Sequence, residues 1–253
     1  MSELNEYKRF FELLAQESGK IVKQYFKSDY QIESKQDSSP VTIADKKSEE
    51  IIRSLISKEF PSHGIIGEEF GETNSGAEYS WMIDPIDGTK SFIAGGFDFG
   101  TIIALSKNGV PQIGMIYQPI LNELMLGDGK NTILNDRKVM VKDCINISEA
   151  TFLTTDFFSV KKYQNFEKFV DLAGKAKLCR TWGNCYGYLL LAAGQAQIMM
   201  DPIMAVWDIL PIIPIVQGAG GIITDYQGKD PLKAKSIIAA VPSLHKQVID
   251  LLN

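Results

Sequence analysis

Apolar residues before Pro61 recur at steps of three and four, which is the spacing of one buried helical face. Residues 3–28 follow this pattern and predict a long amphipathic helix. A second helix is predicted from Thr42, a residue suited to capping a helix N-terminus, up to Pro61, because proline ends a helix. After Pro61 the pattern changes to the short apolar runs that are typical of strands.

Short apolar segments then follow one another closely and predict strands. They lie at 64–67, 79–83, 99–105, 110–117 and 123–126. The dipeptide Asn108-Gly109 joins two of these segments, and Asn-Gly strongly favours a two-residue hairpin turn. We therefore expect the segments to form an antiparallel meander.

From residue 151 onward, strand and helix patterns alternate. Strands are predicted near 152–154, 177–180 and 197–200, helices near 163–172 and 185–193, and a helix, two strands and a helix complete the chain. These patterns predict a mixed α/β fold, with an α+β half at residues 1–145 followed by an α/β half at 146–253. No Gly-, Pro- or Ser-rich linker joins the halves, so we expect one compact unit with its site between them.

The composition is that of an ordinary globular protein and argues against several classes of function. The 253 residues are 45% hydrophobic and 23% charged, and a formal net charge of -5 gives no overall positive field for nucleic acid or an anionic membrane. The sequence has no signal-peptide pattern and no apolar run of about 20 residues. We therefore expect a cytoplasmic protein without a membrane-spanning segment.

Few side chains other than carboxylates are available for catalysis. The three cysteines lack Cys-x-x-Cys spacing, which argues against a disulfide framework or a cysteine zinc site, and we expect Cys179 and Cys185 to be packing thiols. Of the two histidines, His63 is expected in a turn and His245 on the surface of the last helix. Nucleotide-binding and serine-hydrolase motifs are also absent. Any catalytic site is therefore expected to be built from carboxylates.

The segment from Trp81 to Lys90 carries the strongest chemical signal. An apolar strand ends there in Asp84-Pro85-Ile86-Asp87-Gly88-Thr89, where the proline and glycine turn the chain, so that two carboxylates can converge as oxygen ligands for Mg²⁺. The amides of Gly88 and Thr89 are suited to a phosphate if a helix or turn starts there. A lone Asp-x-x-Asp pair is more often a simple turn, because aspartate is a common turn former.

Further carboxylates also lie at the ends of predicted elements. Glu68 and Glu69 follow a short apolar strand, Asp208 precedes the apolar run 209–216, and Asp45 lies in the first turn after the cap of the second helix. Each one alone fits a solvated loop or a helix first turn, where the dipole favours an acid. If these acids meet in the fold, a shared cation would relieve their repulsion.

Four motifs lie in order along nearly the whole chain. They are Pro40-Val41-Thr42-x-Ala44-Asp45, Gly67-Glu68-Glu69, Asp84-Pro85-Ile86-Asp87-Gly88-Thr89, and Trp207-Asp208 running to Ala219-Gly220-Gly221. In this order they resemble the inositol monophosphatase family of Mg²⁺-dependent, lithium-sensitive phosphatases. The resemblance implies a layered αβαβα sandwich of the sugar-phosphatase type.

The resemblance also implies a set of metal ligands. Glu68, Asp84 and the backbone carbonyl of Ile86 would bind one Mg²⁺, while Asp84, Asp87 and Asp208 would bind a second. A third, weaker ion would join near Glu68 when substrate binds. This is the arrangement of a two-metal phosphoryl transfer.

The remaining matched positions are implied in handling water and phosphate. Thr89 and Asp45 would orient or deprotonate the attacking water, with Glu68 beside them as the third catalytic residue. Asp87 and the amides of Gly88 and Thr89 would contact the substrate at its phosphate. No histidine or cysteine nucleophile is needed for this chemistry.

The second half holds the expected specificity residues. Residues 179–188, Cys-Arg-Thr-Trp-Gly-Asn-Cys-Tyr-Gly-Tyr, resemble the signature of histidinol-phosphate phosphatases of this family, which implies substrate contacts for Arg180 and Asp201. A carboxylate at Asp201 suits the ammonium and imidazole groups of histidinol phosphate. From the residues alone, Asp201 fits a turn before Pro202 equally well, and Trp182 and the nearby tyrosines fit core packing.

The chain departs from the family pattern at positions that match no implied metal ligand. Asn184 stands where the histidinol-phosphate signature has Asp, and Gly218 stands where Glu is common. Pro211 and Pro214 enter a segment that is helical in the family. Pro211 fits the first turn of a helix, but Pro214 would cost about 3 kcal/mol in a regular interior unless the helix is kinked.

The sequence therefore predicts a Mg²⁺-dependent phosphatase that hydrolyses L-histidinol phosphate in histidine biosynthesis. One alternative is an inositol-1-monophosphatase or a broad sugar or nucleotide phosphatase with the same metal chemistry. Another is a regulatory protein that keeps the fold without turnover. The expected partner is a small phosphate monoester, and the resemblance implies a homodimer.

Overall fold

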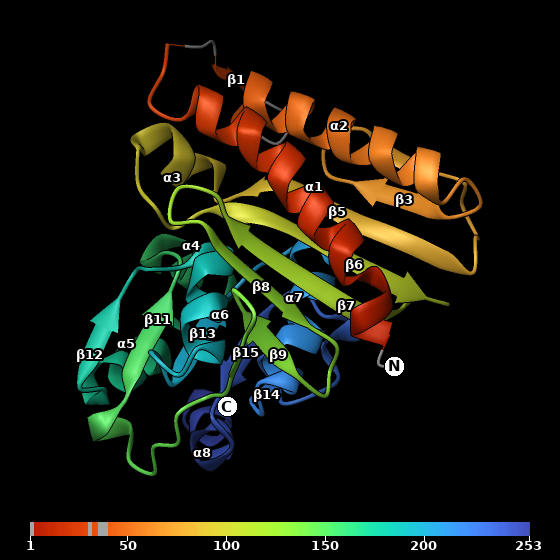
Figure 1. The fold of residues 1–253 in the computed structure, drawn as a ribbon. Helices are drawn as coiled ribbons and strands as arrows, with labels where there is room; N and C mark the ends of the chain where they lie inside the picture. Colours follow the sequence, from red (N-terminus) through yellow and green to blue (C-terminus); the bar gives the residue numbers. More distant parts are fainter. Residues whose placement is uncertain (1–2, 30–31, 35–39) are drawn as a thin grey trace.

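The computed structural model describes residues 3–29, 32–34 and 40–253, which form five layers (Figure 1). Two helices cover one face of an eight-stranded sheet, and two more helices lie between that sheet and a five-stranded sheet. Three helices cover the far face of the smaller sheet. The predicted αβαβα sandwich is therefore confirmed.

The outer layer consists of α1 (Glu3–Tyr25) and α2 (Ile43–Glu59), close to the predicted bounds. Thr42 caps α2: its hydroxyl accepts a backbone N–H of the first turn, while Asp45 accepts the Thr42 N–H at 2.8 Å. The apolar faces of both helices pack against the outer face of the large sheet, and this contact buries Trp81 of the sheet completely.

The large sheet contains the predicted meander. Its strands, in order of pairing, are β10 (Arg137–Val139), β9 (Thr132–Leu134), β8 (Glu123–Gly127), β7 (Val110–Gln118), β6 (Gly100–Lys107), β5 (Tyr79–Asp87), β3 (Gly64–Gly67) and β4 (Gly71–Thr73). From β5 to β10 every pairing is antiparallel, and β6 turns into β7 at Asn108-Gly109, where both residues have positive φ. The expectation that 64–67 belongs to the antiparallel meander is wrong, because β4 reverses the chain and leaves β3 parallel to β5.

The small sheet combines parallel and antiparallel strands. In order they are β12 (Leu178–Arg180), β11 (Thr151–Thr154), β13 (Ile198–Asp201), β15 (Ile237–Ala240) and β14 (Ile222–Thr224). Its outer face is covered by α4 (Phe157–Tyr163), α5 (Phe166–Lys175) and α8 (Pro242–Leu252). The helix predicted near 163–172 is present as α5, which begins three residues later because Asn165 caps it by accepting a backbone N–H at 3.1 Å, while α4 was not predicted.

The middle layer consists of α6 (Asn184–Ala192) and α7 (Val206–Gly218), which are buried between the two sheets. Helix α7 continues through Pro211 and Pro214, so neither proline ends it. Its backbone is also bonded outside the helix: the Pro214 carbonyl accepts the N–H of Gly129 at 3.0 Å, and the next carbonyl accepts the Thr132 hydroxyl at 2.7 Å. These contacts tie the helix to the β8–β9 turn.

The remaining elements are short. They are the pair β1 (Ile32–Ser34) and β2 (Pro40–Thr42), α3 (Thr89–Ala94), and the 3₁₀ turns Ile147–Glu149 and Pro231–Lys233.

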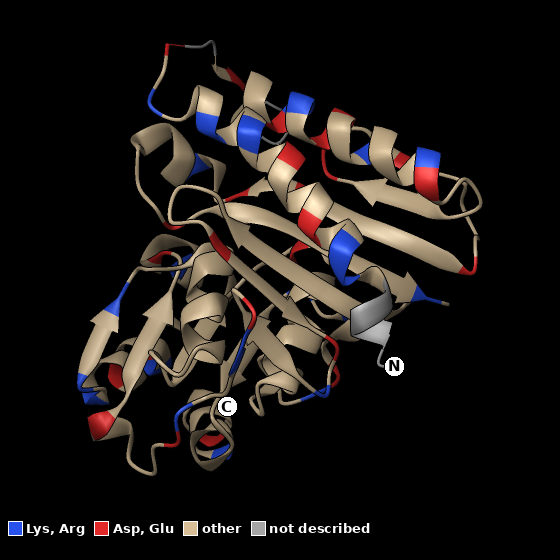
Figure 2. Ribbon diagram, in the orientation of Figure 1, with Lys and Arg blue, Asp and Glu red and all other residues tan. Residues whose placement is uncertain are grey.

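Charged residues lie mainly on helices, loops and strand ends, while the middles of the strands carry almost none (Figure 2). Within the three described ranges, no helix has both the length and the apolar character needed to cross a membrane.

The two histidines serve packing rather than chemistry. His63 lies in the expected turn, where its ring stacks on Phe60 and its Nδ1 accepts the Trp81 indole N–H at 3.1 Å. The expectation that His245 is a surface residue is wrong: it is buried on the inner side of α8, with Nε2 2.8 Å from the Thr224 hydroxyl. Burial lowers the pKa of both imidazoles.

Candidate active site

Three carboxylates from distant parts of the chain meet between the large sheet and the middle helices. Asp84 and Asp87 lie at the end of β5, and Asp208 lies in the first turn of α7. One carboxylate oxygen of each lies within 4.8 Å of the others. This group of three is called the carboxylate cluster below.

A β-bulge turns Asp84 and Asp87 to the same face of β5. In a regular strand, residues three positions apart point to opposite faces. Here Asp84 pairs with Ile102 and Asp87 pairs with Gly100, so β5 carries one extra residue between the two pairs. Pro85 is tolerated within this bulge because its missing N–H is not needed for pairing. The sequence order Asp-Pro-x-Asp therefore has a structural reason.

Backbone amides hold each carboxylate in place. Asp84 accepts the N–H of Ile86 at 2.9 Å, Asp87 accepts that of Cys185, and Asp208 accepts that of Ala205 at 2.7 Å. Amide dipoles orient the oxygens without neutralising the charge. Helix α6 thus helps to build the site through its backbone as well as through its side chains.

Burial and mutual repulsion disfavour the charged form of this cluster. Burial raises the pKa of Asp84 and of Asp208 well above its ordinary value, and the neighbouring carboxylates raise both further. Burial also raises the pKa of Asp87 to about 7, although the hydrogen bond from Cys185 opposes this shift. Without a counter-ion the cluster therefore holds protons that isolated aspartates would release.

The donor set of the cluster fits a hard divalent cation. Among the described residues, no lysine or arginine forms an ion pair with Asp84, Asp87 or Asp208. Every side-chain donor in the cluster is a carboxylate oxygen, which Mg²⁺ prefers over nitrogen or sulfur. A bound cation would supply the missing positive charge.

Glu68 extends the site from the neighbouring strand. Its N–H donates to the carbonyl of Ile83 at 3.1 Å, which continues the parallel pairing of Gly67 with Ile83 by one residue. Glu68 consequently lies beside Asp84, whose pKa it helps to raise, and it lines the cavity in front of the cluster.

Asp45 and Thr89 form a hydrogen-bonded pair next to the cluster. The buried Asp45 accepts the N–H and the hydroxyl of Thr42 through Oδ2, and its Oδ1 lies 3.3 Å from Thr89 Oγ1. The Thr89 hydroxyl also lies 3.1 Å from the carbonyl oxygen of Ile86. Burial raises the pKa of Asp45, and the charge of Glu68 raises it further. The Thr89 hydroxyl can therefore donate to Asp45 while it accepts a hydrogen bond from a water.

The approach of α3 to α6 explains two residues of the predicted motifs. Gly88 has φ 89°, and a Cβ there would lie 2.8 Å from the Asp98 carbonyl oxygen and from Asn184 Nδ2. Asn184 itself donates from Nδ2 to that carbonyl at 2.6 Å and from its N–H to the Thr155 hydroxyl at 2.9 Å. An amide at position 184 thus joins the two halves of the chain.

A cavity of about 790 Å³ opens in front of the carboxylates. From the first half it is lined by Asp84, Asp87, Glu68 and the start of α3, including Gly88 and Thr89. From the second half its walls are Thr155, Asp156, Phe158, Ser159, Asn184, Ile203, Ala205, Trp207 and Asp208. The sequence did not single out Asp156, Phe158 or Ile203, since an N-cap aspartate and two apolar residues carry no signal of their own.

Asp201 lies one layer behind the cluster. It ends β13 and lines an adjoining cavity of about 180 Å³, which also contacts Asp87 and Asp208. Its carboxylate accepts the hydroxyl of Thr155 at 2.5 Å and that of Tyr188 at 3.0 Å. Burial raises the pKa of Asp201 to about 6.

Arg180 lies apart from these cavities. It ends the edge strand β12, is exposed, and donates to the carbonyl of Cys179 at 2.7 Å. As far as the described residues define the two cavity linings, Arg180 belongs to neither. Core packing, which the sequence left open for Trp182, does not occur: this residue is 49% exposed, because it follows the edge strand into a loop. Tyr188 does pack in the core, as expected.

Comparison with known proteins places this site in a family. The model of the inositol monophosphatase family matches residues 3–253. The chain is 38% identical to a histidinol-phosphatase of Chlorobaculum parvum, over 93% of this chain and 92% of that protein. It is 39% identical to the chloroplastic bifunctional phosphatase IMPL2 of Arabidopsis thaliana, over 96% of this chain and 71% of that protein.

A solved structure gives the same result. An inositol monophosphatase from Zymomonas mobilis superposes with a TM-score of 0.88 and 31% identity, covering 100% of this chain and 99% of that one. The match therefore includes both sheets and the three layers of helices. The chain belongs to the inositol monophosphatase family of phosphatases.

Proposed function

We propose that this phosphatase is a Mg²⁺-dependent phosphomonoesterase that hydrolyses L-histidinol phosphate to L-histidinol and phosphate. The observation that carries the proposal is the cluster of Asp84, Asp87 and Asp208, which lines a cavity and has no basic partner among the described residues. Phosphatases of this family depend on Mg²⁺. Lithium sensitivity, a homodimer and a cytoplasmic location stay predictions from the family resemblance.

In this proposal the chain's own groups hold the ions and move one proton. Glu68, the cluster and the Ile86 carbonyl would hold two or three Mg²⁺, which when bound lower the pKa of the attacking water and neutralise phosphate charge. The Thr89 hydroxyl, 3.3 Å from Asp45, would accept a proton from that water while its own proton passes to the buried carboxylate of Asp45. The amides of Gly88 and Thr89, which lie in the cavity lining, would contact the phosphate oxygens.

The cavity walls that come from the second half of the chain are suited to a substrate with a cationic leaving group. Histidinol phosphate carries an ammonium and a protonatable imidazole. Asp156 lines both cavities, and Asp201 lies at the back of the smaller one. Phe158 is 85% exposed at the cavity wall, where an aromatic face is free to contact a cation. Ile203 adds an apolar surface beside them.

The similar proteins support both this substrate and one alternative. The relative from Chlorobaculum parvum is named a histidinol-phosphatase, and the structure from Zymomonas mobilis is an inositol monophosphatase. Inositol 1-phosphate is therefore the second candidate. It is neutral outside its phosphate, so its binding does not need the carboxylate of Asp156.

A parallel assay of L-histidinol phosphate, inositol 1-phosphate and adenosine 3′,5′-bisphosphate distinguishes the candidates. We expect kcat/KM to be highest for L-histidinol phosphate by at least about tenfold, which corresponds to about 1.4 kcal/mol in transition-state binding. A clear preference for inositol 1-phosphate would contradict the proposed substrate.

The variant Asp156→Asn tests the charge of the cavity wall. Asn keeps the cap of α4, which Asp156 forms by accepting the Ser159 N–H at 2.7 Å. We expect the variant to lower kcat/KM for L-histidinol phosphate while leaving that for inositol 1-phosphate unchanged. Equal losses for both substrates would exclude a charge-specific role for Asp156.

A further inference from the structure

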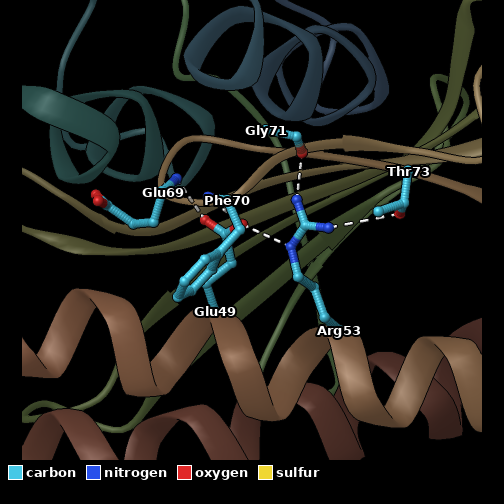
Figure 3. A network of polar contacts seen from close by, with 6 residues as sticks. All are labelled: Glu49, Arg53, Glu69, Phe70, Gly71 and Thr73. Carbon is cyan, nitrogen blue, oxygen red and sulfur yellow. Dashed lines mark hydrogen bonds and ion pairs between the residues drawn. The ribbon is translucent and has the colours of Figure 1, made fainter.

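Glu49 is a fully buried carboxylate in the interior of α2, outside the site described above. It lies beneath residues 68–70, the loop that joins β3 to β4 (Figure 3). None of the motifs discussed for catalysis includes it. Burying a carboxylate is unfavourable unless it is hydrogen-bonded and paired, so its partners show what it does.

All the partners of Glu49 shown in Figure 3 come from this loop or from Arg53. Oε2 accepts the N–H of Glu69 at 2.7 Å, and Oε1 accepts that of Phe70 at 3.2 Å. Oε1 also accepts the Nε–H of Arg53 at 2.7 Å. One carboxylate therefore satisfies two consecutive loop amides that no strand pairing could satisfy.

Arg53 fastens the other end of the same loop. Its guanidinium donates to the carbonyl of Gly71 and lies 3.5 Å from the Thr73 hydroxyl, both on β4 (Figure 3). Its side chain is only 13% exposed. Glu49 therefore holds the loop at Glu69 and Phe70, and Arg53 holds β4, the strand that follows the loop.

Gly67 shows how closely the carboxylate approaches the backbone. A Cβ at this position would lie 2.0 Å from Glu49 Oε1 and 2.4 Å from its carboxyl carbon. A side chain at position 67 would thus displace Glu49. The buried carboxylate is packed against the residue immediately before Glu68.

Glu68 is consequently fixed from both sides. Its own N–H is bonded to the Ile83 carbonyl on β5, and the next N–H, that of Glu69, is bonded to Glu49. Between these two anchors the Glu68 side chain lies beside Asp84 and lines the cavity. Loosening the second anchor would remove one of the restraints that orient Glu68 toward Asp84.

We propose that Glu49 and Arg53 are positioning residues that hold Glu68 toward the carboxylate cluster and thereby set the affinity of the site for Mg²⁺. This inference rests on the proposed function, because it assigns Glu68 to metal binding. Neither residue is part of the described lining of the cavity in front of the cluster. Residues that orient metal ligands typically change metal affinity by about 10- to 100-fold when they are replaced.

The test compares Glu49→Gln with Glu50→Gln, which removes the same charge from an exposed neighbour on α2. Gln keeps the size of Glu49 but turns an NH₂ group toward one of the loop N–H groups. We expect direct calorimetric titration with Mg²⁺ to show affinity weakened by about 10-fold or more in Glu49→Gln only. Activity titrated with Mg²⁺ should shift equally, with kcat regained at saturating Mg²⁺ and substrate KM unchanged.

A second pair of variants separates weakened Mg²⁺ binding from loss of the folded structure. Arg53→Met keeps Glu49 but removes both its ion pair with Arg53 and the fastening of β4, and Lys58→Met is its exposed control on the same helix. Circular dichroism melting reports whether each variant is folded. Folded Glu49→Gln and Arg53→Met proteins that bind Mg²⁺ as tightly as wild type would overturn the inference. Wild-type protein that neither binds nor needs Mg²⁺ would instead contradict the proposed function.

Discussion

Asp87 shows how much of the site depends on a charge that the chain does not supply. Its carboxylate is held by a backbone amide of α6 and lies close to Asp84 and Asp208. Burial raises its pKa from the ordinary 3.8 to about 7. The metal-free folded protein therefore keeps a proton on Asp87 over a pH range in which the unfolded chain has lost it.

This difference predicts how pH affects the metal-free protein. Because the folded cluster binds more protons than the unfolded chain, its stabilising contribution is present below the ordinary pKa of 3.8 and is lost as pH rises toward about 7. Denaturant unfolding in chelator should show this loss for wild type and a smaller one for Asp87→Asn. Added Mg²⁺ should restore stability most at the higher pH. Identical pH profiles for the two proteins would rule out this linkage.

Single residues were predicted from the sequence with mixed success. Asp84, Asp87 and Asp208 meet because each lies at the end of an element, which the pattern of apolar runs reveals. Arg180 lies at a strand end as well, but at the edge of the small sheet, and its side chain is exposed rather than directed into a cavity. Edge and centre cannot be told apart without the strand order, which is a property of the whole sheet.

At the scale of elements, a pair of glycines decides how α7 lies on the large sheet. Gly114 on β7 pairs with Gly127 on β8. A Cβ at Gly114 would lie 1.8 Å from the Pro211 carbonyl oxygen, and a Cβ at Gly127 would lie 2.5 Å from Ile215 Cα. The helix backbone therefore contacts the sheet directly, which fixes Asp208 relative to β5.

The variant Gly114→Ala should consequently be destabilised by about 1–3 kcal/mol or more, because backbone atoms cannot move aside as a flexible side chain would. Gly174→Ala on α5 is the matched control: its Cβ meets nothing within 4 Å, and alanine in a helix gains up to about 1 kcal/mol. Urea unfolding of both variants measures the difference. Equal stability of Gly114→Ala and wild type would show that α7 does not contact β7 this closely.

Elements with long periodic patterns were predicted well, and short ones were not. α1 and α2 follow from helical spacing and a capping residue, and the β6–β7 hairpin follows from Asn108-Gly109. The strand β4 was missed because three exposed residues carry no alternation. Packing explains why glycine stands at position 218 where the family commonly has Glu: a Cβ there would lie 2.5 Å from the Asn131 carbonyl oxygen. The sequence alone does not reveal this contact.

At the scale of the whole molecule, the two halves share one interior. Residues of α6 and α7 from the second half pack in one core with residues of β5 and β6 from the first, including Met82 and Ile102. The carboxylate cluster lies at the end of this shared layer, with Asp84 and Asp87 from one half and Asp208 from the other. The site therefore exists only when both halves are folded together.

The central claim is that this cluster makes the protein a metal-activated phosphatase. Phosphate release from L-histidinol phosphate, measured across a Mg²⁺ titration after treatment with chelator, tests it for wild type and Asp87→Asn. We predict that wild type is inactive without Mg²⁺ and recovers fully, while the folded variant stays at least about 100-fold slower at saturating Mg²⁺. A near-normal rate for Asp87→Asn at saturating Mg²⁺, or full wild-type activity in chelator, would contradict the claim.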